Sequence, residues 1–480
     1  MKTIKNILWM LSFFLLLTGC KDSFFDVNTP SNVLDESQIS YKMELPYIES
    51  HIASMQYSIV RYMDGLYDQQ LASASIGGAD THDRTSLGGA WSTYYSRILP
   101  NVKIMKKLAQ EDNNSHYLGI AQILEALATQ MATDQWGDIP YSEAGMGSQN
   151  LTPNLDSQED IYNSLLNLLN NAITNLQASA NGEEPGADDL FYGGDLNKWI
   201  KAAYTLKARL NIHLTKRNGT TAAQDAIDAL QNGFTSTSDD MQIIYDAVAK
   251  NPWYSNVVAA NQTGNLSVLW SEQLIDQMNG TDYPYTNITY DPRLPHYADN
   301  HGNATYVGSD NGAGGNGNCD LANDGYFTED APVFLLTYME AEFIKSEAEF
   351  ILGHKQNAYN AYIAGITASM DKVGIPTSDR DDYLNENSIG FWGDFNQLEM
   401  KHILKEKNIA LVVHPEPYTD MRRYNFDPAI FIDLDFPQNR SLDIPAGEWP
   451  RRAIYPNSEV KRNPNIEQIT EYWSPVWWDQ

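Results

Sequence analysis

Residues 332–366, PVFLLTYMEAEFIKSEAEFILGHKQNAYNAYIAGI, carry the clearest fold signal in the chain. Apolar and small residues recur there at helical spacing in two runs. They stand at Ile344, Ala348, Ile351 and Leu352, then at Ala358, Ala361, Tyr362, Gly365 and Ile366. Gly353 separates the runs and suits a helix end, while Pro332 suits a first helical turn. We therefore expect two helices joined by a short turn, with small residues at their contact.

Similar stripes occur earlier in the chain. They are formed by Ile120, Ile123, Leu124, Leu127 and Met131; by Ile161, Leu165, Leu168, Leu169, Ile173 and Leu176; and by Trp199, Ala203, Leu206 and Leu210. Residues 157–160, SQED, resemble a capping box at the start of the second stripe. There is little strict alternation and no strict repeat of about 34 residues. The sequence predicts an all-α fold of tetratricopeptide-like helix pairs with few short strands.

Long irregular segments separate the predicted helices. Residues 251–330, 375–396 and 425–480 are rich in turn-forming residues, and residues 303–324 are the most glycine-dense part of the chain. Loops of this length on a helical scaffold are usually either functional or disordered. Any ligand site is therefore expected on a loop-rich face.

The first twenty residues carry an export signal. Lys2 and Lys5 precede the apolar run ILWMLSFFLLL at residues 7–17, which is too short to span a bilayer. Leu17-Thr18-Gly19-Cys20 then forms a lipobox, with Cys20 as the acylated residue. We expect a signal peptide over residues 1–19, a lipid anchor and tether over 20–40, and one helical domain over 41–480. Several acyl chains on one residue give stable membrane anchoring.

Composition and motifs argue against several function classes. Acidic residues outnumber basic ones 62 to 32, so a phosphate backbone is an unfavourable partner and no nucleic acid is expected. Once Cys20 is lipidated, Cys319 has no partner in the chain and is read as an incidental thiol. No zinc-protease helix, nucleophile elbow or phosphate loop is present. We expect no enzyme activity, cofactor or metal, although a glycosidase needs only two carboxylates.

Several motifs, in order along the chain, resemble the SusD/RagB family of outer-membrane lipoproteins. They are FDVNTP at 25–30, DQWGDIPYSEA at 134–144, DPRLP at 291–295, LTYMEAEFIKSEA at 336–348, DMRR at 420–423, PRRAIYP at 450–456 and VWWD at 476–479. Each also has a structural interpretation. The sequence around Gly137 suits a helix end and turn, and the arginine pairs suit carboxylates or loop carbonyls. We expect these motifs to hold the fold together and to lie outside the ligand site.

The resemblance implies a function and a partner. It implies four tetratricopeptide-like helix pairs with a loop-rich face, on a lipid-anchored protein at the outer membrane that faces the exterior. It also implies that the protein binds nutrient oligosaccharides and covers a SusC-like TonB-dependent barrel. Some members bind peptides, so a peptide or another non-sugar nutrient is the alternative, and a surface glycosidase is a third possibility.

Aromatic residues in the loops are the candidate sugar contacts, because rings stack on the C–H faces of sugars. The candidates are Trp91, Tyr94, Trp253, Tyr254, Tyr283 and Tyr285. The resemblance favours Trp91, since the family's corresponding W-x-x-Y stretch lies near its ligand face. We expect Trp91 where a loop containing Gly88 and Gly89 meets a helix that starts near Tyr94. The alternative is that these rings are core or loop anchors.

Overall fold

The computed structural model describes residues 39–480. The predicted signal peptide, the lipidation site Cys20 and the motif at residues 25–30 lie outside this range. Within residues 39–480, none of the helices has both the length and the apolar character needed to cross a membrane.

Helices dominate the described part of the chain. The longer ones are α2 (Tyr41–Ile59), α4 (Gly88–Thr93), α5 (Leu99–Glu111), α6 (Ser115–Trp136), α7 (Gln158–Gln177), α8 (Leu196–His213), α9 (Thr215–Leu230), α11 (Glu272–Asn279), α13 (Tyr338–Ile351), α14 (Lys355–Val373), α15 (Thr377–Leu384), α16 (Met400–Ala410) and α17 (Glu416–Arg423). Short helices are α3 (Gly65–Tyr67), α10 (Ala259–Asn261), α12 (Leu294–Tyr297) and α18 (Asn457–Val460). Three π-helical turns cover Val60–Asp64, Tyr94–Ile98 and Tyr254–Val258.

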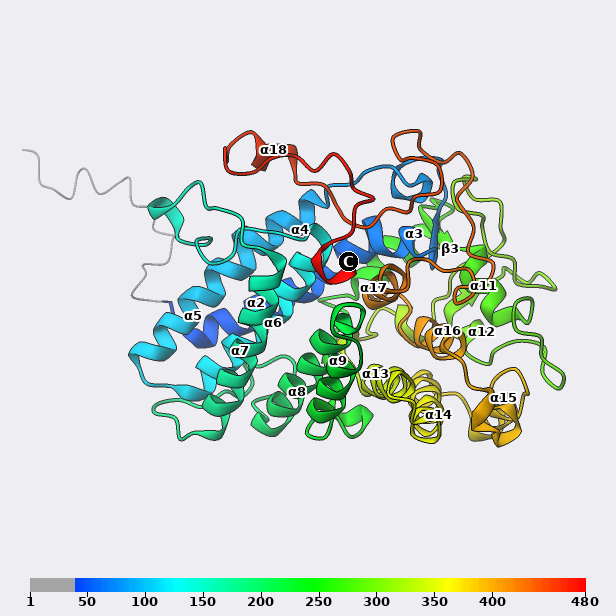
Figure 1. Ribbon diagram of the computed structural model, residues 1–480, viewed down its shortest axis with the longest axis horizontal. Helices are drawn as coiled ribbons and strands as arrows, with labels where there is room; N and C mark the ends of the chain where they lie inside the picture. Colours follow the sequence, from blue (N-terminus) through cyan, green and yellow to red (C-terminus); the bar gives the residue numbers. More distant parts are fainter. Residues whose placement is uncertain (1–38) are drawn as a thin grey trace, which may run out of the picture.

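The long helices pack as neighbours in pairs: α2 with α5, α6 with α7, α8 with α9, and α13 with α14. In Figure 1 they follow one another along the left and lower sides of the molecule, while α11 and the loops lie on the right and the C-terminal segment crosses the top. This arrangement confirms the predicted all-α fold of tetratricopeptide-like helix pairs.

Between residues 39 and 480 the strands are short and form three two-stranded antiparallel sheets. β1 (Leu71–Ser73) pairs with β3 (Val268–Trp270), β2 (Met241–Ile243) with β6 (Val333–Leu336), and β4 (Ala298–Asp299) with β5 (Asp320–Leu321). The β1–β3 and β2–β6 sheets join segments that are distant in the sequence. The strands therefore fasten loops to the helical scaffold.

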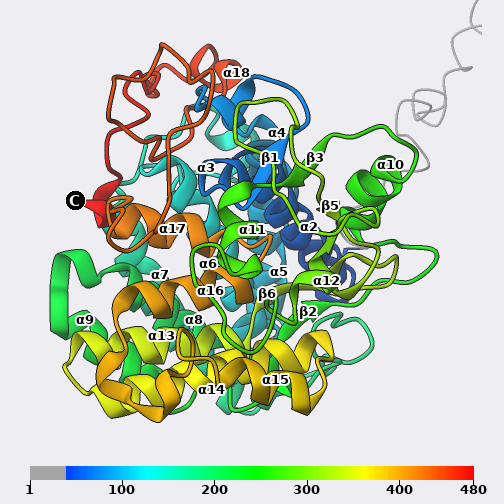
Figure 2. The ribbon, with the colours of Figure 1, turned by 90° about the vertical axis from the view of Figure 1, so that its right-hand side faces the viewer.

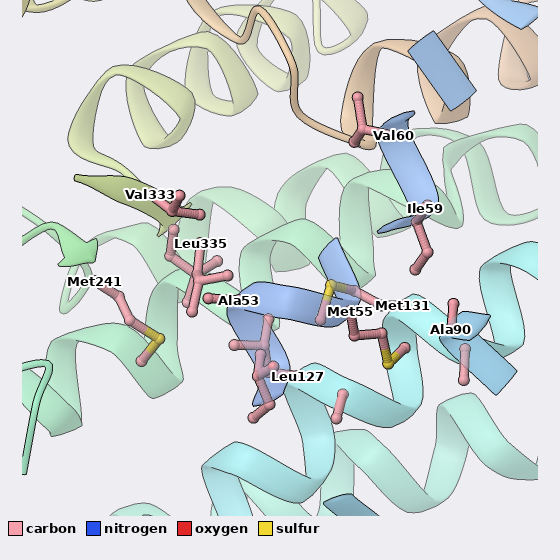
Figure 3. Close-up of a cluster of buried hydrophobic side chains, with 14 of the residues drawn as sticks. Ala53, Met55, Ile59, Val60, Ala90, Leu127, Met131, Met241, Val333 and Leu335 are labelled. Atoms are coloured by element: carbon pink, nitrogen blue, oxygen red, sulfur yellow. The ribbon is translucent and has the colours of Figure 1, made fainter. Parts of the chain in front are cut away.

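The largest apolar core lies where α2 meets α6 and the β2–β6 sheet. Figure 3 draws part of it, with Ala53 and Met55 of α2 beside Leu127 and Met131 of α6 and Leu335 of β6. All five side chains are at most 1% exposed. Such complete burial favours folding by roughly 1.5–3 kcal/mol for each large aliphatic side chain.

The predicted helix boundaries are largely confirmed. The side chain of Ser157 caps α7 by accepting a hydrogen bond from the backbone N–H of Asp160. α6 ends at Gly137, whose φ of +77° is the left-handed turn that the sequence around it indicated. α13 and α14 are separated by Gly353, also in a left-handed conformation.

Four boundary predictions were wrong. Pro332 does not start α13: residues 333–336 form β6 because they pair with β2, and Thr337 caps the helix. Residues 251–330 and 375–396 are not wholly irregular, since they contain α11 and α15. Trp91 does not mark a junction between loop and helix, because α4 already begins at Gly88.

The arginine pairs hold the scaffold together, as their sequence context indicated. Arg423 of α17 contacts Glu347 of α13 at 2.7 Å and Asp420 at 2.5 Å, with all three side chains buried. Arg422 donates a 2.6 Å hydrogen bond to the backbone carbonyl of Asp134. Arg451 pairs with Asp479 near the C-terminus at 2.5 Å. The C-terminal motifs thus anchor the last segment onto the helices.

Candidate ligand-binding site

A cavity of about 380 Å³ opens among α11, two loop segments and Gln69, on the side of the molecule that carries α11. This volume falls within the range of small-molecule pockets, which is roughly 300–1,000 Å³. We call it the acidic pocket, and its wall consists of Gln69, Ser271, Glu272, Gln273, Asp276, Asp282, Asp310, Asn311, Asp433, Asp435, Phe436, Pro437 and Gln438. Figure 2 shows α11 near the centre of the face turned to the viewer.

Backbone contacts bring the three segments of the wall together. The N–H of Glu272, at the start of α11, donates to the carbonyl of Ser309 at 3.0 Å. The N–H of Gln438 donates to the carbonyl of Asn311 at 2.7 Å. The buried side chain of Gln69 donates to the carbonyl of Asp435 at 2.7 Å. The wall is therefore fixed by hydrogen bonds between segments that are remote in sequence.

The glycine-dense segment 303–324 supplies part of this wall. Gly312 has a φ of +76°, and a Cβ there would collide with the backbone of Gln438. A Cβ at Gly308 would collide with the backbone of Ser271 and Glu272. Glycine is needed at both positions because the backbones approach so closely. These contacts place Asp310 and Asn311 in the pocket wall.

The pocket has a strongly acidic wall. Six carboxylates line it, at Glu272, Asp276, Asp282, Asp310, Asp433 and Asp435, and none of the lining residues is basic. A hydrogen bond with Asp310, followed by burial, raises the pKa of Glu272 to about 7. Burial, followed by a hydrogen bond with Asp433, raises the pKa of Asp282 to about 8. Near neutral pH, Glu272 and Asp282 therefore hold their protons more readily than ordinary carboxyl groups do.

One side of the pocket is apolar. Phe436 and Pro437 line it, and the Phe436 ring is 42% exposed. Phe436 stacks on Trp449 at 4.6 Å between ring centroids, and Trp449 stacks on the buried Phe426 at 4.9 Å. The guanidinium of Arg440 lies 4.6 Å from the Phe436 ring centre. This packing holds an apolar surface rigidly beside the carboxylates.

The arrangement suits a polyhydroxylated ligand. Carboxylate and amide oxygens accept hydrogen bonds from hydroxyl groups, amide N–H groups donate to them, and Phe436 offers apolar surface. The same oxygen-rich wall has the donor chemistry that hard cations such as Ca²⁺ prefer.

Comparison with known proteins identifies the family. A family model described as "SusD-like_2: Starch-binding associating with outer membrane" matches residues 36–456. The chain belongs to this SusD-like family. A search of curated proteins finds no match.

Solved structures share the SusD-like fold. A chitin-binding protein is 24% identical with a TM-score of 0.73, covering 92% of this chain and 100% of its own. A SusD homolog from Parabacteroides distasonis is 20% identical with a TM-score of 0.75. The match covers 92% of this chain and 98% of the homolog. A chitin-binding SusD homolog from Flavobacterium johnsoniae is 18% identical with a TM-score of 0.71. The match covers 92% of this chain and 98% of that homolog.

In this SusD-like chain, three of the six aromatic candidates are packed in the interior. Trp91 is 6% exposed and meets Trp136 edge-on at 5.0 Å, and Tyr94 is fully buried with its hydroxyl 2.9 Å from Thr129. Trp253 is 3% exposed and packs on Tyr57. For these rings the structure favours the alternative of core anchors, because a buried ring offers no face to a sugar.

The remaining candidates are Tyr254, Tyr283 and Tyr285. Tyr254 is half-buried, with the amine of Lys250 5.8 Å from its ring centre. Tyr283 is 6% exposed and Tyr285 half-buried, and both lie in the loop that follows α11. Asp282, the neighbour of Tyr283, lines the acidic pocket. A ligand role for the six aromatic candidates stays a prediction.

The sequence did not single out the pocket carboxylates. They are six among 62 acidic residues, spread from position 272 to position 435 and in no short motif. The glycine-dense segment between positions 303 and 324 was the one available signal, because close backbone approach requires glycine.

Two other groups of side chains have metal-ligand chemistry in the described part of the chain. Asp134, His213 and Glu416 are buried together, but Trp478 donates to Asp134 at 2.8 Å and His213 bonds to Glu416 at 2.7 Å. These protein contacts make that group part of the scaffold. Asp299, His301 and Asp320 lie together at the β4–β5 hairpin, with His301 exposed.

Proposed function

We propose that this protein binds nutrient oligosaccharides in the acidic pocket and delivers them to a SusC-like TonB-dependent barrel in the outer membrane. The observation that carries the proposal is the pocket itself. It combines closely spaced carboxyl groups with the exposed ring of Phe436, in a chain of the SusD-like family. The family description and the chitin-binding relatives support a glycan as the ligand.

We further propose that the protein is held at the outer membrane by lipid on Cys20 and faces the exterior. The lipobox at residues 17–20 supports the anchor. The family's association with the outer membrane supports the location. The protein then acts as a binding protein and not as an enzyme, in keeping with the binding role that the family description names.

A glycan array run beside a hydrolysis assay tests this function. We expect one class of oligosaccharide to bind and to remain uncleaved. Retention of a peptide library with no bound glycan would favour the peptide alternative. Release of reducing ends from a bound glycan would show a glycosidase.

A further inference from the structure

A strained turn between α15 and α16 presents a tryptophan to solvent. Phe391, Trp392 and Gly393 have φ values of +54°, +50° and +83°, so three consecutive residues are left-handed. Side chains other than glycine, asparagine and aspartate rarely adopt this conformation. Trp392 is 74% exposed, and no other tryptophan in residues 39–480 is classed as exposed. An aromatic ring in such a conformation needs a physical reason.

Packing on both sides of the turn holds it in place. The Phe391 side chain is 3% exposed. Its ring centroid lies 6.2 Å from that of Tyr362, with the two rings nearly parallel, and 4.8 Å from that of His402. The hydroxyl of Tyr359 donates to the carbonyl of Gly390 at 2.8 Å. A Cβ at Gly390 would collide with the carbonyl of Leu384. The surroundings therefore fix the backbone that carries Trp392, while its indole stays free.

The loop containing this turn is tied to the loop that borders the acidic pocket. The buried carboxylate of Glu386 accepts hydrogen bonds from the backbone N–H groups of residues 286–288 at 2.6–3.2 Å. Asp282, earlier in that second loop, lines the pocket. Figure 2 shows α11, α15 and α16 on the same face.

Contacts between aromatic rings connect the same two loops. The ring of Tyr283, which is next to the pocket residue Asp282, lies 6.3 Å from the ring of His402, measured between ring centroids. His402 in turn contacts Phe391, the neighbour of Trp392. Packed aromatic residues thus connect the turn that carries Trp392 to the loop that borders the acidic pocket.

We infer that Trp392 is a second sugar contact, which stacks on distal units of an oligosaccharide whose other end lies in the acidic pocket. The inference rests on the proposed glycan-binding function. An exposed indole offers a large flat face for the C–H surface of a sugar ring. A turn whose backbone is held in advance loses little backbone entropy on binding, and backbone strain is characteristic of ligand clamps.

Calorimetry with chitohexaose, maltohexaose and the corresponding disaccharides tests this inference. Trp392→Asn removes the ring, while asparagine tolerates the left-handed conformation. We expect it to weaken hexasaccharide binding at least about fivefold and to leave disaccharide binding unchanged. Trp392→Phe should retain most of the affinity. Tyr62→Ala removes a ring that is 56% exposed elsewhere and is the matched control.

The outcomes separate the inference from the proposed function. Equal hexasaccharide affinity in Trp392→Asn and the wild type would overturn the inference and leave the proposed function standing. Failure of the wild type to bind either hexasaccharide would overturn both. Melting temperatures within about 2 °C of the wild type show that a lost affinity is not lost folding.

Discussion

At the scale of single residues, Trp91 shows how burial decides between two roles. Its ring packs against Trp136, Tyr95 and Tyr455 and is 6% exposed. We predict that Trp91→Ala lowers the free energy of unfolding by about 3–5 kcal/mol, because it leaves a cavity among these rings. Chemical denaturation measures the change. A variant of wild-type stability with weakened glycan binding would instead restore Trp91 to the ligand site.

Asp282 predicts a pH-dependent effect in the acidic pocket. Its raised pKa, about 8, means that ionisation is less favourable in the folded protein than in the unfolded chain. The resulting destabilisation is absent below the unfolded pKa of 3.8, grows as pH rises and is complete above about 8. Asp282→Asn removes this charge. We expect it to stabilise the protein at pH 9 on the order of 1 kcal/mol, after allowance for solvent screening of a half-buried carboxyl.

Thermal melts in EDTA at pH 5 and pH 9 measure this effect, since EDTA removes any cation bound by the carboxylates. The stabilisation by Asp282→Asn should be smaller at pH 5 than at pH 9. Asp225→Asn changes an exposed carboxylate outside the pocket and serves as the control. An Asp282→Asn variant less stable than the wild type at pH 9 would contradict a raised pKa of Asp282 in the folded protein.

The sequence allowed only part of the site to be predicted at this scale. Tryptophan and tyrosine are equally suited to a core and to a sugar platform, and only the fold shows which face is free. For Trp91 the helix begins at Gly88 and not near Tyr94 as expected, and the ring is turned inward. The pocket carboxylates come from distant segments, so no local spacing reveals them.

At the scale of elements, Arg423 links α17 to α13. Its guanidinium contacts the buried carboxylates of Glu347 and Asp420, and Lys407 contacts both as well. We predict that Arg423→Met costs about 3–5 kcal/mol of stability, because it leaves buried carboxylates short of positive charge. Urea unfolding measures the loss. The double variant Arg423→Met, Glu347→Gln should recover part of it.

The same contact has a defined pH dependence. Burial alone would raise the pKa of Glu347, but the charges of Arg423 and Lys407 outweigh it and lower this pKa below 4.5. The contribution of Glu347 to stability is therefore present above pH 4.5 and is lost as pH falls through its folded pKa. The loss of unfolding free energy caused by Arg423→Met should therefore be smaller at acid pH. A deficit independent of pH would show that packing, and not charge, is lost.

Helices were more predictable than strands because their signal is local. The stripe from Ile120 to Met131 repeats within one element, and Ser157 caps its own helix. β6 depends on pairing with β2, about 90 residues earlier in the chain, so residues 333–336 read locally as the approach to a helix. Short strands that pair over such distances leave no periodic pattern.

At the scale of the whole molecule, the account predicts a stable complex with a membrane barrel. Protein purified from outer membranes in mild detergent should carry a TonB-dependent barrel in about equal amount, since obligate interfaces commonly bury more than roughly 2,000 Å². Cys20→Ala should lose lipid labelling and leave the membrane fraction. Recovery of the lipidated protein as a monomer would contradict the partnership.

Glycan affinity at the acidic pocket tests the central claim most directly. Calorimetry with the oligosaccharide selected on the array should show that Phe436→Ala weakens binding at least about fivefold. Leu442→Ala, a change at a fully exposed position in the same segment that does not line the pocket, should bind like the wild type. Both variants should melt within about 2 °C of the wild type. Wild-type affinity in a folded Phe436→Ala variant would contradict the assignment of the acidic pocket as the glycan site.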